Sequence, residues 1–155
     1  MILNQDFKEF IKLLEEHEVR YMLVGGYATA YYGYPRFTQD IDFWIWTDSE
    51  NAKKIKRVLI EFGFSSLSLS ESDFETSKNI IQLGYPPNRI DLLTSIDGVD
   101  FEMAYPNHEL FESEGLRIKF IGLEDLIKNK KATGRLQDLA DVEMLEKVNN
   151  KTDRK

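Results

Sequence analysis

The sequence predicts an α/β (α+β) fold in which a mixed β-sheet is flanked by helices and followed by further helices at the C-terminus. Short apolar runs of strand length alternate with segments whose apolar residues recur at helical spacing. Glycine and proline punctuate the boundaries between these segments. The 155 residues are 42% hydrophobic and 30% charged, a composition that suits one domain over 1–155 with its own core.

The elements of the first half follow from local patterns. Apolar residues at helical spacing predict a first helix over 6–17. The run 21–24 predicts a buried strand that breaks at a glycine pair, and a short helix is expected over 27–32. A long strand is expected over 37–46, with an apolar face that packs on the core. A polar cap before an apolar stripe then predicts a helix over about 48–62.

The second half predicts more strands and then two helices. The serine-rich stretch 64–75 fits either an edge strand or a loop. Three further strands are expected, over 79–83, 89–93 and 116–120. The C-terminal helical segment of about 122–148 is expected to contain two helices, over 122–131 and 136–147. The polar tail beyond this segment is expected to fray.

Composition excludes several classes of protein and site. No apolar run approaches the roughly 20 residues that a membrane crossing needs, and the N-terminus lacks the pattern of a secretory signal. We therefore expect a cytoplasmic protein with no membrane partner. The absence of cysteine excludes disulfides, zinc–thiolate sites and cysteine nucleophiles. Any site chemistry must use oxygen and nitrogen ligands.

The charge balance also limits the partners. A net charge of -7 opposes broad attraction to nucleic acid, because that attraction depends on neutralising phosphates with lysine and arginine. An RNA substrate would need a local basic patch. The best candidates are Lys128, Lys130, Lys131 and Arg135. A solvated helix face is the alternative interpretation of these residues.

Two aspartates, Asp40 and Asp42, are the most informative feature of the chain. Residues i and i+2 of a strand project from the same face, so their carboxylates would lie side by side, about 6.6 Å apart at the backbone. Two divalent cations could share such a pair, and magnesium prefers carboxylate oxygens. Asp91 is the natural third ligand because it interrupts an otherwise apolar strand, where a carboxylate is costly without a cation.

A glycine pair precedes the aspartates. Gly25 and Gly26 allow the backbone to approach a phosphate group, and the following helix would direct free N–H groups toward negative charge. A double glycine alone is commonly only a turn, and an isolated Asp-x-Asp is also unspecific. Their combination is much more specific and indicates metal-dependent transfer of a nucleotidyl group.

This arrangement resembles the DNA polymerase β-like nucleotidyltransferase superfamily, whose signature is a strand, Gly-Gly or Gly-Ser, a short helix and a strand with Asp-x-Asp. In this chain the signature runs from Val24-Gly25-Gly26 to Asp40-Ile41-Asp42. The segments 25–28, 36–42 and 130–141 are also similar to small bacterial nucleotidyltransferases related to the AbiEii and MenT toxins. The resemblance covers nearly the whole chain and implies a mixed-sheet nucleotidyltransferase core.

The resemblance also implies roles for individual residues. It implies that the metal ligands are Asp40, Asp42 and Asp91, which would be catalytic together with Lys130. It implies that Gly25 and Gly26 contact the nucleotide and that Lys130 touches the triphosphate or the substrate. Further candidates for nucleotide binding are Arg36, whose guanidinium could offer a fork to phosphate, Thr38 and Arg135. The periodicity places Lys130 on the inward stripe of its helix, where a solvated lysine is not expected. Arg135 could equally form a helix-supporting ion pair with Asp138, and solvent exposure is the alternative for Arg36.

These observations lead to one functional expectation and two alternatives. We expect a magnesium-dependent nucleotidyltransferase that moves a nucleoside monophosphate from an NTP, such as ATP, to a hydroxyl of RNA, with tRNA as one acceptor, or of protein. It would use two Mg²⁺ ions, or Mn²⁺ in their place, and the setting would be a toxin–antitoxin or phage-defence system with a cognate partner. One alternative is transfer to a small molecule such as an aminoglycoside. The other is a nonenzymatic nucleotide-binding antitoxin or partner-binding module.

Overall fold

The strands of the chain form one mixed sheet. The computed structural model describes residues 3–35, 38–64, 69–85 and 88–153. The strands are β1 (Tyr21–Val24), β2 (Ile41–Ile45), β3 (Ile80–Leu83), β4 (Ile90–Leu93), β5 (Glu109–Ser113) and β6 (Leu116–Phe120). They form a six-stranded sheet in the order β3-β4-β2-β1-β6-β5. The predicted α/β class with a mixed sheet is confirmed, since β2 runs antiparallel to β1 but parallel to β4.

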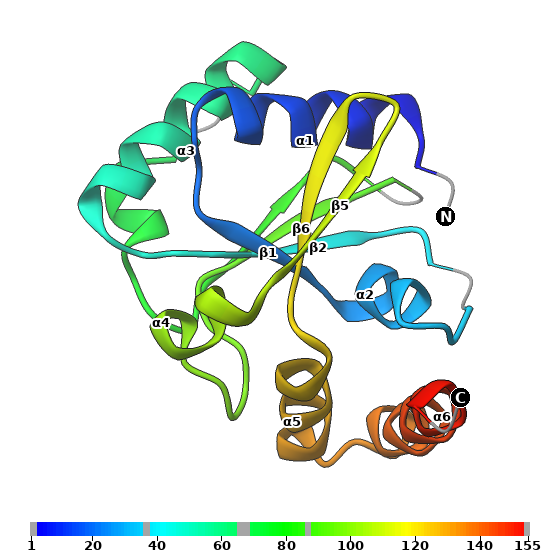
Figure 1. Ribbon diagram of the computed structural model, residues 1–155. Coiled ribbons are helices and arrows are strands. Elements are labelled where there is room, and N and C mark those ends of the chain that lie inside the picture. Colours follow the sequence, from blue (N-terminus) through cyan, green and yellow to red (C-terminus); the bar gives the residue numbers. More distant parts are fainter. Residues whose placement is uncertain (1–2, 36–37, 65–68, 86–87, 154–155) are drawn as a thin grey trace.

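Helices cover both sides of this sheet. The α-helices are α1 (Gln5–Glu16), α2 (Gly25–Tyr31), α3 (Ser49–Phe62), α4 (Phe101–Ala104), α5 (Leu123–Thr133) and α6 (Leu136–Asp153). Two short 3-10 helices are η1 (Glu71–Phe74) and η2 (Tyr105–Asn107). Figure 1 shows α1 and α3 together along one side of the sheet, with α4, α5 and α6 on the opposite side.

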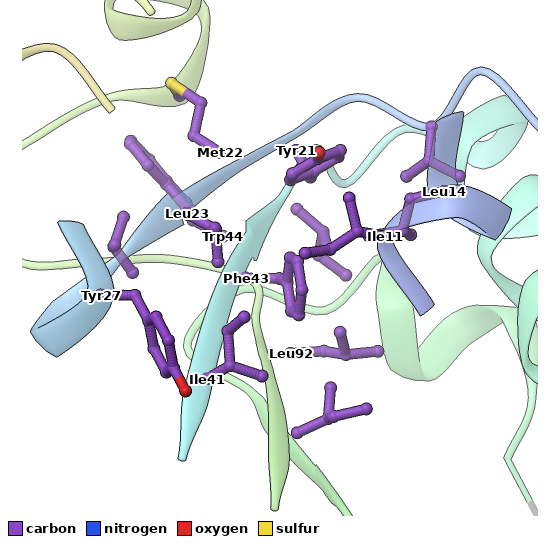
Figure 2. Close-up of a cluster of buried hydrophobic side chains, with 14 of the residues drawn as sticks. Ile11, Leu14, Tyr21, Met22, Leu23, Tyr27, Ile41, Phe43, Trp44 and Leu92 are labelled. Atoms are coloured by element: carbon purple, nitrogen blue, oxygen red, sulfur yellow. The ribbon is translucent and has the colours of Figure 1, made fainter. Parts of the chain in front are cut away.

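The hydrophobic core lies between the sheet and the pair α1 and α3. The ring of Phe43 on β2 lies 5.3 Å from that of Phe10 on α1, and Phe10 in turn meets Phe62 of α3. Figure 2 shows Phe43 in one cluster with Leu92 of β4 and Ile11 of α1. Because side chains alternate along a strand, β2 turns its odd-numbered residues toward this core and its even-numbered residues toward the other side.

Local signals explain where the helices begin and end. Asp48 caps α3 because its side chain accepts a hydrogen bond from the backbone N–H of Asn51, and Gly63 ends the helix in the left-handed conformation. Asn4 caps α1 in the same way. Over the described part of the chain, no helix combines the length and apolar character that a membrane crossing requires.

Several boundaries differ from the sequence-based expectation. The second strand was expected over 37–46, but β2 covers only Ile41–Ile45, and its pairing starts where Asp42 meets Val24 of β1 and Ile41 meets Ile90 of β4. The sequence also gave no expectation of α4 or of β5, whose residues are mostly exposed and show no clear apolar period. Finally, α6 continues to Asp153 rather than ending near 147.

Candidate active site

The sheet brings the three predicted acidic residues together. Asp42 of β2 and Asp91 of β4 are direct partners in the parallel register, so the two carboxylates lie on neighbouring strands at the same level. Asp40 lies two residues before Asp42, just ahead of β2. Because Phe43 faces the core, these carboxylates project to the side of the sheet that carries α4, α5 and α6.

Each glycine of the Gly25-Gly26 pair makes room for a particular side chain. Asp42 pairs with Val24, so the chain turns into α2 directly beside the Asp42 carboxyl group. Gly25 has a φ of +67°, and a Cβ atom there would clash with Oδ2 of Asp42. A Cβ on Gly26 would lie 3.0 Å from Thr38. The glycine pair is therefore explained first by the close approach of the Asp-x-Asp segment.

Arg89 joins two of the three carboxylates. Its Nε lies 2.7 Å from Oδ1 of Asp91, and its Nη2 donates to Oδ2 of the same residue at 3.1 Å. Nη2 also lies 3.0 Å from Oδ2 of Asp40. Arg89 was not singled out from the sequence. The signal that could have found it is its position two residues before Asp91, which places both side chains on one face of an extended chain.

The ionised form of the Asp42 carboxyl group is disfavoured in the folded protein. Burial, followed by the nearby carboxylates of Asp91 and Asp40, raises the pKa of Asp42 to about 7, although Arg89 acts in the opposite direction. Burial and the charge of Asp40 also raise the pKa of Tyr27, which places this phenol next to the cluster. Among the residues that the structure describes, the three carboxylates therefore carry more negative charge than Arg89 neutralises.

The chemistry of this cluster fits a divalent cation. Carboxylate oxygens are the ligands that Mg²⁺ and Mn²⁺ prefer. Oδ1 of Asp40 is buried and has no hydrogen-bond partner among the described residues, so a polar atom is left without compensation. Across those residues, however, no group of three or more histidine, cysteine, aspartate or glutamate side chains is already arranged to hold a metal ion. In this arrangement the guanidinium of Arg89 supplies the positive charge.

Lys130 lies in a separate buried network between α5 and α6. Its side chain is only 5% exposed, which confirms the predicted inward position. The ammonium group lies 2.9 Å from Asp141 and 3.3 Å from Asp138, both on α6. Asp138 also accepts from the guanidinium of Arg135 at 2.8 Å. The ion pair considered for Arg135 is therefore present, whereas contact of Lys130 or Arg135 with a nucleotide stays a prediction.

The remaining predicted residues are placed as follows. The hydroxyl of Thr38 donates to the carbonyl oxygen of Asp40 at 3.1 Å, so Thr38 shapes the segment that leads into β2. Arg36 lies outside the described residues. Of the predicted basic patch, Lys130 is buried and Lys131 pairs with Glu146 of α6. Lys128, Lys131 and Arg135 are exposed, so Lys130 is the member of the predicted patch that does not face solvent.

Comparison with known proteins agrees with this geometry. A family model described as "Nucleotidyl transferase of unknown function (DUF2204)" matches residues 3–155. The chain belongs to this family. The DUF2204 family is thus one of nucleotidyltransferase type, and a cluster of three acidic side chains on and just before adjacent strands is in keeping with that description. A comparison with the curated proteins gives no match.

Two solved structures share the fold of this DUF2204 protein. One is a candidate nucleotidyltransferase from Thermotoga maritima, with a TM-score of 0.55 and 21% identity, in which the match covers 94% of this chain and 91% of the other. The second is an antigenic nucleotidyltransferase-like protein from Paracoccidioides brasiliensis, with a TM-score of 0.55 and 20% identity, covering 92% and 77% of the two chains. At this identity the likeness establishes the fold alone.

Proposed function

We propose that this protein is a Mg²⁺-dependent nucleotidyltransferase that moves a nucleoside monophosphate from an NTP to a hydroxyl group of RNA or protein. The observation that carries the proposal is the cluster formed by Asp42 and Asp91 on adjacent strands and by Asp40 just before β2. Its partly uncompensated negative charge and the unpaired oxygen of Asp40 call for a cationic ligand. Family membership supports an NTP as the source of the transferred group.

The reaction forms one bond and breaks one. The acceptor oxygen attacks the α-phosphorus of the NTP, the bond from this phosphorus to the oxygen that bridges to the β-phosphate breaks, and pyrophosphate leaves. The acceptor hydroxyl loses its proton in the process. Bound divalent cations would neutralise the phosphate charge and lower the pKa of the attacking hydroxyl.

The residues of the chain have distinct parts in this proposal. Asp40 and Asp42 would hold the cations, and Asp91 would complete the ligand set and help to activate the acceptor oxygen. Gly25 and Gly26 leave the backbone open next to Asp42, where a triphosphate could approach closely. Lys130 is buried and bound to two carboxylates of α6, so contact with a phosphate would use the third N–H of its ammonium group or replace one of these carboxylates.

The similarity of segments 25–28, 36–42 and 130–141 to AbiEii- and MenT-like proteins supports a toxin–antitoxin or phage-defence setting, with tRNA as one acceptor. The net charge of -7 makes a macromolecular acceptor dependent on local contacts rather than on overall attraction. The identity of the acceptor therefore has to come from the labelled product.

The test is a transfer assay with product identification. Purified protein, Mg²⁺ or Mn²⁺ and a cell lysate are incubated with each of the four NTPs labelled at the α-phosphate, and labelled RNA, protein and small molecules are separated. We expect label in RNA or protein from the wild type, none from Asp40→Asn or Asp42→Asn, and wild-type labelling from the exposed control Asp6→Asn. If the label appears in a small molecule, the acceptor is a small molecule instead of RNA or protein. Transfer retained by both aspartate variants, or nucleotide binding without any transfer, would contradict the proposal.

A further inference from the structure

The contacts of Arg89 tie up half of the carboxylate oxygens in the cluster. The guanidinium binds both oxygens of Asp91 and Oδ2 of Asp40. The Asp91 pair is bidentate, which is the strongest geometry available to an arginine and a carboxylate. Asp42 is not among the ion-pair partners of Arg89. Arg89 therefore holds two of the three acidic side chains, and its charge offsets only part of the negative charge on the third.

The backbone of Arg89 is fixed while its side chain retains access to solvent. Its carbonyl oxygen accepts a hydrogen bond from the N–H of Ile41 at 3.1 Å, which anchors the residue at the start of the β2–β4 pairing. The side chain is nevertheless 24% exposed, whereas that of Asp91 is 9% exposed. The Arg89 side chain is thus more open to solvent than that of Asp91, and it can leave the carboxylates by rotating about its own side-chain bonds while the strand stays paired.

The charges set up a competition. A divalent cation that uses Asp91 as a ligand needs an oxygen that Arg89 now occupies, whereas Asp40 still offers its Oδ1, which has no hydrogen-bond partner among the described residues. In addition, a guanidinium next to the site repels the cation. Both effects weaken cation binding. A purely supporting role for Arg89 would have the opposite effect, because loss of the arginine would let Asp40 and Asp91 repel each other and would weaken the site.

We propose that Arg89 is a positioning residue that competes with the divalent cation for the oxygens of Asp40 and Asp91, so that the guanidinium leaves at least one of them when the cation binds. This inference rests on the proposed function, since it requires a cation site at the acidic cluster. It adds that the protein carries its own internal counter-ion for that site.

The first experiment measures Mn²⁺ affinity by isothermal titration calorimetry without nucleotide. Arg89→Gln should bind Mn²⁺ about tenfold more tightly than the wild type, because one competing positive charge is gone. Arg89→Lys keeps the charge and should stay within about threefold of the wild type. Arg117→Gln is the matched control, since it removes the same charge from an exposed arginine that pairs with Glu112, and it should change the affinity by less than about twofold.

The outcomes separate the two proposals. Tighter binding by Arg89→Gln with no change in Arg117→Gln supports the competition, and equal or weaker binding by a folded Arg89→Gln overturns it while leaving the cation site intact. If the wild type binds no Mn²⁺, or if Asp42→Asn does not abolish the binding that the wild type shows, the cation site and the competition both fail.

A second measurement on the wild type decides the question if Arg89→Gln does not fold. In the ¹⁵N NMR spectrum of the arginine Nε–H groups, the Arg89 signal, assigned by its loss in Arg89→Lys, should shift as Mg²⁺ is added and reach a plateau when the site is saturated. A signal that stays unchanged at saturating Mg²⁺ would show that the guanidinium keeps its partners and would overturn the inference.

Discussion

Asp42→Asn should make the folded protein more stable while it abolishes transfer. The Asp42 carboxyl group is buried beside Asp91 and Asp40, and its ionised form is disfavoured in the folded state. Asparagine has nearly the same shape, carries no charge and can donate its amide hydrogens to the neighbouring carboxylate. A residue kept for catalysis at the expense of stability should behave in this way.

The magnitude follows from the pKa shift. The pKa of Asp42 is raised from 3.8 to about 7, a difference of about 3 units, and each unit corresponds to about 1.4 kcal/mol, so the ionised carboxyl destabilises the fold by at most about 4 kcal/mol. Since the amide must itself be accommodated, we expect Asp42→Asn to gain about 2 kcal/mol at pH 8. For a chain of this length that gain raises the Tm by roughly 4–8 °C.

The sign of the pH dependence follows from the same shift. Because the folded-state pKa is the higher one, the contribution of Asp42 to stability is fully present below the unfolded pKa of 3.8 and is lost as the pH rises through about 7. The advantage of Asp42→Asn over the wild type should therefore be near zero at pH 4, grow between pH 4 and 7, and stay constant above pH 8.

The assay is urea unfolding followed by circular dichroism, in EDTA, from pH 4 to pH 8.5. Asp6→Asn is the control, since Asp6 is exposed in the first turn of α1 and its loss should change the free energy of unfolding by less than about 1 kcal/mol at any pH. The reasoning is refuted if Asp42→Asn is less stable than the wild type at pH 8, or if the difference between them does not vary with pH.

Three further predictions follow from the same structure. Gly25→Ala should destabilise the fold by about 2 kcal/mol more than Gly115→Ala in urea unfolding, because both glycines have a positive φ but only the first meets a side chain, and equal losses would contradict this. Lys130→Met should lower the free energy of unfolding by about 3 kcal/mol, since it removes the cation that lies between two buried aspartates of α6, and an unchanged Tm would show that this network contributes nothing. Mg²⁺ at about 100 times its Kd should stabilise the wild type by about 2.7 kcal/mol in thermal unfolding, but not Asp40→Asn, and an equal shift in both proteins would place the cation elsewhere.

Sequence patterns predicted the elements that have a strong local period or clear end signals. The strand at Tyr21–Val24 and the helix that begins after Asp48 lie where the apolar pattern and the polar cap place them. The exposed β5 was missed because an edge strand with little apolar contact has no such pattern. The strand that contains Asp42 was predicted to start too early, since pairing partners rather than local sequence decide where a strand starts.

The sequence by itself placed Asp42 and Asp91 in strands and the glycine pair at the end of another strand, because strand periodicity is a local property that residue types reveal. Only the tertiary structure decided that Asp42 lies opposite Asp91 and that the lack of a side chain at Gly25 makes room for the Asp42 carboxyl group. It also decided that Arg89 forms ion pairs with Asp40 and Asp91. The physical reason is that register and ion pairing join residues distant in the chain, and the free energy of each contact depends on neighbours that no local pattern specifies.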